Sequence, residues 1–363
     1  MKFGRSVGFI ILLIVILSIG GYVILSKNPP SFIKPYITSP TLTTVNGYLG
    51  WEKMGFFTDN QVKSIFKQKY NLDVQINKKG SIEMVTGSYS GLNYLFPSNN
   101  VALEIFKSRN NNKNVQSSTI FYSPIVIYSW KSLLPDLLNS GLVKQQDNYY
   151  VIDLKKLVGF IEQNKTWQDL GGKVLTGKVS ISSTDPTKSS SGNLFLAIVS
   201  SVIANKDQVT IKDDLTPIFN ERIGNFFNKM GLMDTSSGDF FDKFLNLGRS
   251  TYPLAVGYEN QYIEVFNEKK LDISDVVPLY PNPTVWAEHQ FIALDDNGIK
   301  LMQALQNDSD LKKVGWEKHG FRRTDEQVNT DIYKSQNIAK EIQYTIPLPK
   351  AEVMQQLIDY LSK

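Results

Sequence analysis

A run of small polar residues between two apolar segments is the part of the chain best suited to bind a ligand. Residues 182–193 (SSTDPTKSSSGN) follow a strand-like KVSI segment and precede an apolar, helix-forming run at 194–204. Such a turn gathers unpaired backbone N–H groups and hydroxyls at a helix start, where the helix dipole adds partial positive charge. It can therefore hold a small polar or anionic group without covalent chemistry. An ordinary helix N-cap is the alternative interpretation, because Ser and Thr are preferred at that position in any protein.

The motifs that would indicate catalysis or a metal site are incomplete. Residues 172–178 (GKVLTGK) come close to a phosphate-binding loop, but Val179 stands where that motif needs Ser or Thr. A GSYSG stretch carries Tyr89 where a hydrolase would carry its nucleophile. The two histidines, His289 and His319, have no cysteine or second histidine at the spacing of metal ligands. We therefore predict no catalytic residue, no metal site and no cofactor.

The composition is that of a folded protein with more than one domain. The chain has 363 residues, of which 42% are hydrophobic and 20% charged, and this length is typical of about two or three domains. The net charge of +4 is small and no basic cluster stands out, so we predict no nucleic-acid partner. Because the chain has no cysteine, disulfides, thiolate chemistry and lipid attachment through an N-terminal cysteine are excluded.

The N-terminal segment predicts a membrane anchor. An uncharged, apolar run occupies residues 7–25, from Val7 to Leu25, and follows the basic residues Lys2 and Arg5. At about 1.5 Å per residue, such a helix crosses most of a hydrocarbon core. Positive charge before the run keeps the N-terminus in the cytoplasm. We therefore expect a single-pass protein of the cell membrane whose globular part lies outside the cytoplasm.

A cleaved signal peptide is the alternative for residues 1–27, with the tripeptide SIG at 18–20 as an imperfect cleavage site. Both interpretations export the rest of the chain. Residues 28–40 are rich in proline and predict a stiff spacer between membrane and domain.

The remaining chain alternates short apolar runs with helical patterns, which predicts an α/β fold with parallel strands. Small polar loops follow several expected strands, at 47–50, 80–81 and 184–192, and open α/β sheets bind ligands at that edge. We expect strands at 42–47, 72–76, 92–96, 123–128, 179–181, 254–258, 276–279, 284–287 and 291–294, and helices after Asp59 and Gly80 and at 133–138, 154–161, 194–204, 218–230, 240–247, 298–305 and 351–361.

In this order, the segments resemble the type II periplasmic solute-binding proteins of bacterial ABC-type uptake systems, over roughly residues 40–325. The resemblance rests on GSIEM at 80–84, the strand SPIVIY at 123–128, the polar run at 184–192, LAVGYEN at 254–260 and YPNPT at 280–284. Each pattern is weak, and their order and spacing together carry the resemblance.

The resemblance implies two α/β lobes that close on a solute by hinge motion, after an N-terminal transmembrane helix. Lobe one would comprise residues 41–127 and 279–363, and lobe two residues 128–278. The implied ligand contacts are Gly80, Ser81 and Glu83 from lobe one, and Thr184, Asp185, Ser189, Ser190, Ser191, Gly192, Asn193, Tyr258, Glu259 and Asn260 from lobe two.

The implied function is capture of a small polar solute and its presentation to a membrane partner such as an ABC permease, without enzymatic activity. Backbone donors favour an anion or carboxylate, whereas Glu259 would suit an amine if it faced the cleft. The chain departs from the family because it has neither a lipidated cysteine nor a clear cleavage site, and because bulky Tyr48 and Trp51 stand in the first loop. A membrane-anchored sensor or assembly subunit is therefore the alternative, ahead of an enzyme on the same scaffold.

Overall fold

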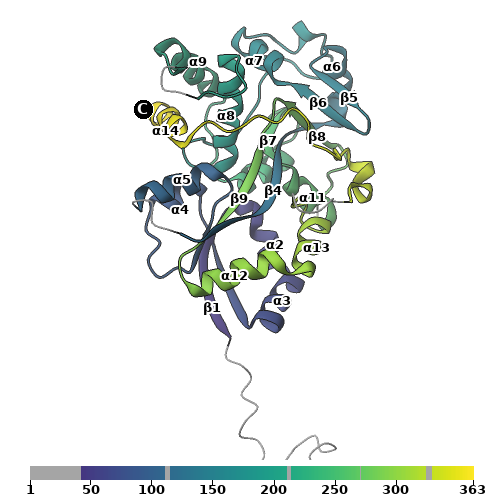
Figure 1. Cartoon of the computed structure of the whole chain (residues 1–363). Helices are drawn as coiled ribbons and strands as arrows, with labels where there is room; N and C mark the ends of the chain where they lie inside the picture. The colour runs from purple at the N-terminus through teal and green to yellow at the C-terminus, as the bar shows by residue number, and fades with distance from the viewer. Residues whose placement is uncertain (1–41, 111–114, 211–213, 270, 324–328) are drawn as a thin grey trace, which may run out of the picture. The chain divides into compact units, whose positions relative to one another are not determined.

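One long strand, β4 (Ser117–Trp130), joins two β-sheets. Its residues 117–124 pair antiparallel with β9 (Trp286–Ala293), and its residues 125–130 pair with β7 (Ala255–Tyr258) and β8 (Val276–Asn282). Figure 1 shows β4 and β9 running between the two halves of residues 43–363. We call these halves the first and the second lobe, according to the sheet that each contains.

The structure is a computed structural model that describes residues 42–110, 115–210, 214–269, 271–323 and 329–363. The apolar run at 7–25 and the spacer at 28–40 therefore lie outside the described residues. Within those ranges, no helix combines the length and the apolar character that a membrane span requires.

The first sheet has the strand order β2–β1–β3–β9–β4. Strands β1 (Thr43–Leu49), β2 (Leu72–Lys78) and β3 (Tyr94–Phe96) are parallel, as the strand–helix–strand pattern predicts. Because β1 and β2 end at the same edge, the loops that follow them meet there. The second sheet continues from β8 to β6 (Tyr149–Asp153) and β5 (Val143–Gln146).

Helices cover both sheets, and several begin at a side chain that caps their first turn. Asp59 accepts hydrogen bonds from the backbone of Gln61 and Val62 at the start of α3, as predicted. The helices of the first lobe are α2 (Met54–Thr58), α3 (Asn60–Tyr70), α4 (Ser81–Thr86), α5 (Asn100–Arg109), α12 (Asp296–Asn307) and α13 (Ser309–Glu317). Those of the second lobe are α6 (Leu134–Asn139), α7 (Leu154–Glu162), α8 (Ser190–Ala204), α9 (Pro217–Asn228), α10 (Ser237–Leu247) and α11 (Glu259–Glu268).

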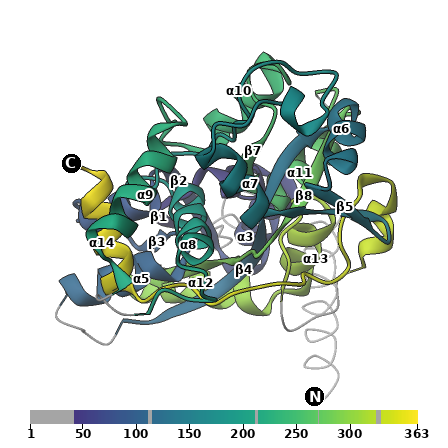
Figure 2. The same cartoon turned by 90° about the horizontal axis from the view of Figure 1, so that it is seen from above.

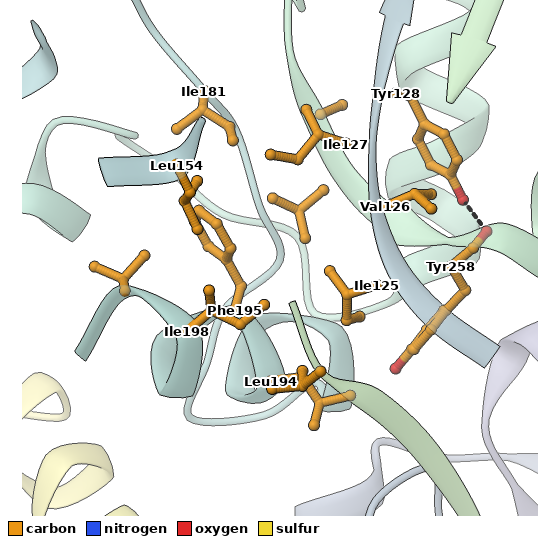
Figure 3. Packing of buried hydrophobic residues seen from close by; sticks show 14 of the residues in the cluster. Ile125, Val126, Ile127, Tyr128, Leu154, Ile181, Leu194, Phe195, Ile198 and Tyr258 are labelled. Carbon is orange, nitrogen blue, oxygen red and sulfur yellow. Dashed lines mark hydrogen bonds between the residues drawn. The ribbon is translucent and has the colours of Figure 1, made fainter. Parts of the chain in front are cut away.

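Helix α8 lies in the core of the second lobe, because it is apolar on nearly all sides. It packs against α7, α9, β4 and β7, and Figure 2 shows it among these elements. Its residues Leu194, Phe195 and Ile198 are fully buried, and Figure 3 shows them with Ile125 and Ile127 of β4. A helix that is apolar all round is stable only inside a core. The position of α8 in turn fixes where its polar first turn lies.

The C-terminal part of the chain crosses from one lobe to the other. After a short 3₁₀ segment (Thr330–Gln336), the chain forms a bridge between Thr345 and Thr284. It ends in α14 (Ala351–Leu361), which packs against both α5 and α9.

Two expectations about strands were wrong in detail. The segments at 284–287 and 291–294 belong to one continuous strand, β9, because its residues 286–292 pair with β4. The segment at 179–181 forms no strand: Ser182 makes a single bridge to Ala255, and the chain then turns toward α8. The predicted division of the lobes at residues 127 and 279 stays a prediction.

Candidate ligand-binding site

A cavity of about 550 Å³ lies where β1, β2 and β7 end, and residues of both lobes line it. This is the strand edge at which open α/β sheets bind ligands. From the first lobe it is lined by Gly50, Trp51, Glu52, Lys78, Lys79, Gly80, Ser81, Ile82, Glu83 and Thr86, and from the second lobe by Thr187, Lys188, Ser189, Ser190, Thr235, Ser236, Ser237, Asp239 and Tyr258.

The first turn of α8 points into this cavity. Ser189 is the N-cap residue, but its side chain makes no capping hydrogen bond. Ser190 is only 4% exposed, and its buried hydroxyl oxygen makes no hydrogen bond of ordinary geometry to the described residues, although the Tyr258 hydroxyl lies close to it. The first backbone N–H groups of a helix also lack intrahelical acceptors. A buried hydroxyl beside the start of a 15-residue helix can donate a hydrogen bond to an oxyanion.

The other predicted residues of this loop shape it. The Ser191 hydroxyl lies 2.7 Å from the Thr184 hydroxyl and 3.1 Å from the Ser189 hydroxyl, so it connects the loop to the N-cap. Asp185 accepts hydrogen bonds from the backbone and hydroxyl of Thr187. None of Thr184, Asp185 or Ser191 is among the residues that line the cavity.

Gly192 and Asn193 place α8 against the loop at Thr184 and against the start of α5. A Cβ atom at Gly192 would lie 2.2 Å from the carbonyl oxygen of Thr184, so only glycine allows the helix to approach this loop. The amide of Asn99, the N-cap of α5, donates to Asn193 over 3.3 Å and so links the two lobes.

In the first lobe, Gly80, Ser81 and Glu83 all line the cavity. A Cβ atom at Gly80 would lie 2.7 Å from the carbonyl oxygen of Lys188, so glycine permits close contact between the lobes here. The Ser81 hydroxyl accepts a hydrogen bond from the backbone of Ser98. The Glu83 side chain is largely exposed and lies 3.9 Å from Lys79.

The predicted residues at the end of β7 separate into two groups. Tyr258 lines the cavity, and burial raises the pKa of its hydroxyl well above the usual value, although hydrogen bonding with the Ser190 and Ser191 hydroxyls lowers it. The Tyr258 hydroxyl therefore stays protonated and lies beside the start of α8. Glu259 instead lies away from the cavity, in a fully buried ion pair with Arg322 at 2.6 and 2.8 Å. Asn260 donates to the backbone carbonyl of Glu52 over 3.1 Å and links the lobes.

A buried polar cluster in the first lobe was not predicted from the sequence. Lys53 is fully buried; its ammonium contacts Glu52 directly, the Ser98 hydroxyl at 2.7 Å and His289 Nδ1 at 3.1 Å. Glu52 also accepts a hydrogen bond from Ser98 and belongs to the cavity wall. The only signal in the sequence is a Glu-Lys pair directly after a strand, which is usually a solvated surface pair. Its burial depends on β9, more than 230 residues further along, as the separation of Lys53 from His289 shows.

Glu52 is ionised in this cluster. Burial alone would raise the pKa of Glu52, but the Lys53 ammonium and His289 beside it hold this pKa far below its usual value. Burial also lowers the pKa of Lys53, which Glu52 opposes. The cavity wall therefore contains an ionised carboxylate, and the Lys53 ammonium that contacts it compensates its charge.

Acid is expected to destabilise the protein through His289. Burial, and then the Lys53 ammonium, lower the pKa of His289 from 6.5 to about 4. Between these values the unfolded chain binds a proton that the folded chain does not, so the free energy of unfolding falls as the pH falls, by about 3 kcal/mol in all. Urea unfolding at several pH values measures this loss. In His289→Gln, the free energy of unfolding should change less between pH 6.5 and 4. An unchanged pH dependence in this variant would contradict the role given to His289.

Trp51 closes one side of the cavity by contact with the second lobe. A Cβ atom at Gly238, in the first turn of α10, would lie 1.3 Å from the Trp51 indole, so the ring lies directly on that backbone. The Lys78 ammonium lies 4.0 Å from the ring centre and 3.9 Å from Asp239. Trp51 therefore acts as a contact between the lobes. Among the described residues, no group of three or more His, Cys, Asp or Glu side chains is placed to hold a metal ion.

Comparison with solved structures decides the fold. Iron-bound HitA from Pseudomonas aeruginosa aligns over 88% of this chain and 100% of its own, with a TM-score of 0.54 and 13% identity. An ABC transporter from Clostridium perfringens ATCC 13124 covers 88% of this chain and 98% of its own (TM-score 0.51, 11% identity). The chain has the type II periplasmic-binding-protein fold. The sulfate-binding protein SubI from Mycobacterium tuberculosis H37Rv agrees, over 88% of this chain and 96% of its own, with a TM-score of 0.50 and 13% identity.

The type II periplasmic-binding-protein fold was predicted from the order of the motifs, and this prediction is confirmed. Neither a protein-family model nor a curated protein matches the sequence. At these identities the likeness establishes the fold, and function has to be argued from the site. HitA was solved with iron bound, and SubI is a sulfate-binding protein.

Proposed function

We propose that this protein captures a small solute through an oxyanion group in the cavity between its lobes. The observation that carries the proposal is the start of α8, where the buried Ser190 hydroxyl lines the cavity and makes no hydrogen bond of ordinary geometry within the part of the chain that the structure describes. Ser189 and Tyr258 line the cavity on the same side. Hydrogen bonds to an ionised ligand in a site closed to water are stronger than those between neutral groups.

The fold supports solute binding as the function, because its solved relatives include a sulfate-binding protein and an ABC transporter. We further propose that the apolar run from Val7 to Leu25 tethers the protein outside the cytoplasm, and that it presents its solute to a membrane partner such as an ABC permease. No catalytic step is part of the proposal. If the tether is correct, the chain partitions with membranes, and deletion of residues 1–27 releases it; full-length protein in the soluble fraction would contradict the tether.

A solute screen tests the binding function. Full-length protein in mild detergent is heated with sulfate, phosphate, carboxylates, phosphate monoesters, neutral sugars or polyamines. A ligand at a hundred times its Kd stabilises the folded state by about 2.7 kcal/mol, which raises the melting temperature measurably. We expect a shift with at least one oxyanion class and none with neutral sugars. A screen in which only sugars or polyamines, or no solute at all, shift the melting temperature would overturn the proposal.

A further inference from the structure

The two lobes offer the ligand opposite kinds of chemistry. On the second lobe, the Ser190 hydroxyl and the first N–H groups of α8 are donors. On the first lobe, the cavity is lined by Glu52, a carboxylate that can only accept hydrogen bonds while it is ionised. A solute that is an oxyanion throughout would satisfy the second lobe and offer no hydrogen-bond donor to Glu52 on the first.

Contacts with neighbouring side chains in the described part of the chain involve one oxygen of the Glu52 carboxylate. Lys53, Ser98 and His289 all contact its Oε1 atom, and no described hydrogen bond involves Oε2. Gly50 makes room for this arrangement, because a Cβ atom there would lie 2.5 and 2.7 Å from the two carboxylate oxygens. The carboxylate is fixed in position, and its second oxygen remains available as an acceptor.

Each lysine of the cavity wall lies near a carboxylate, although only two of these carboxylates belong to the wall. Lys78 lies 3.9 Å from Asp239, and Lys79 lies 3.9 Å from Glu83. Lys188 lies 3.3 Å from Asp185. These pairs leave little net charge, so the start of α8 and Glu52 dominate the polarity of the cavity.

The cavity is also larger than a single inorganic oxyanion requires. Its volume of about 550 Å³ lies within the range of roughly 300–1,000 Å³ that is typical of sites for organic ligands. A sulfate bound at Ser190 would leave most of it to water.

We propose that the solute is an organic anion with a hydroxyl or ammonium donor at the end opposite its oxyanion, the oxyanion at Ser190 and the donor at Glu52. This inference rests on the proposed function, because it assumes that the oxyanion binds at α8. It deepens that function by naming the substrate class. A donor at this end would strengthen binding, since a hydrogen bond to the ionised Glu52 carboxylate is stronger than one between neutral groups.

Two matched series of ligands test the inference by calorimetric titration of the full-length protein. One compares propyl phosphate with glycerol 3-phosphate and phosphoethanolamine; the other compares propionate with glycerate and β-alanine. Within each series the oxyanion is constant, and the members differ in their donors. In at least one series, we expect a donor-bearing member to bind at least tenfold more tightly than the member without a donor, a difference of about 1.4 kcal/mol. The hydroxyl and ammonium arms show which donor is preferred.

Variants at the first lobe show whether Glu52 is the acceptor. Glu52→Gln alone would leave the Lys53 ammonium buried without a counter-ion, so the double variant Glu52→Gln/Lys53→Met is the better test. It should lose the preference for the donor and bind the donor-free member as well as the native protein does. The double variant Glu104→Gln/Lys107→Met, at a surface pair on α5, is the control. Its preference should be unchanged.

The possible results separate the two proposals. If inorganic sulfate or the donor-free members bind as tightly as the donor-bearing ones, the oxyanion site stands and the inference about the substrate class is wrong. The same holds if the double variant at Glu52 keeps the preference. If no oxyanion of either series binds and none does in the broader screen, the proposed function itself is wrong.

Discussion

Replacing Ser190 by aspartate is expected to weaken binding of an oxyanion solute at least a hundredfold. Ser190 is the first residue of α8, and its buried hydroxyl lines the cavity without a hydrogen bond of ordinary geometry to any described residue. A carboxylate there occupies the donors that the solute needs. It also repels the solute's charge by about 4 kcal/mol at a separation of 4 Å in a medium of effective dielectric constant 20. Titration of the full-length variant with the best solute of the screen measures the loss.

In the same variant the helix dipole offsets part of the cost of burying a carboxylate, and a thermal melt checks that the variant is folded. Ser190→Ala removes one hydrogen bond only, so we expect a loss of about tenfold or less. Asn60→Asp places the same charge at the first residue of α3, outside the cavity wall, and should leave the affinity unchanged. Near-native affinity of Ser190→Asp would show that the oxyanion does not bind at α8.

Replacing Arg322 by methionine is expected to lower the free energy of unfolding by about 3–5 kcal/mol, because it leaves a buried carboxylate without its cation. Arg322 donates to both oxygens of Glu259, at 2.6 and 2.8 Å, and Glu259 is fully buried. It also donates to the carbonyl oxygens of Ala339 and Lys340 in the C-terminal segment, which lose their partner too. Urea unfolding of native and variant protein measures the difference.

A surface pair and a double variant provide the controls. Arg222 pairs with Glu162 in the same two-pronged geometry, at 3.0 Å for each bond, but is nearly half exposed. Arg222→Met should therefore cost less than about 1 kcal/mol. The double variant Glu259→Gln/Arg322→Met removes both charges and should recover part of the stability. An equal loss in the Arg322 and Arg222 variants would contradict the role of burial.

Much of the fold is predictable from short stretches of sequence. Asp59 is followed by apolar residues three and four positions apart, which predicted a helix capped by Asp59; α3 begins there. The apolar run at 194–204 predicted a helix, and α8 covers it, although its buried surroundings gave no signal of their own. Helices such as α5 and α13 were missed, because their apolar faces become evident only against the sheets that they cover.

The candidate site was predicted in part. The polar loop before α8 and the loop at Gly80 both reach the cavity, since both follow strands that end at one edge. Glu259, by contrast, follows a strand in the same way but pairs with Arg322, which lies 63 residues further along. Nothing near either residue in the sequence indicates this partnership.

The sequence by itself determined the α/β fold class, the order of motifs that resembles the solute-binding proteins, and the polar helix start as a candidate ligand site. These properties depend on neighbouring residues: alternation, capping and small residues act over a few positions. Only the tertiary structure decided which carboxylate lines the cavity and which is neutralised. Glu52 is held by His289 and Ser98, and Glu259 by Arg322, because strands and helices distant in the chain pack side by side. The desolvation of a charge, and hence its role, depends on that packing and on nothing that a short segment contains.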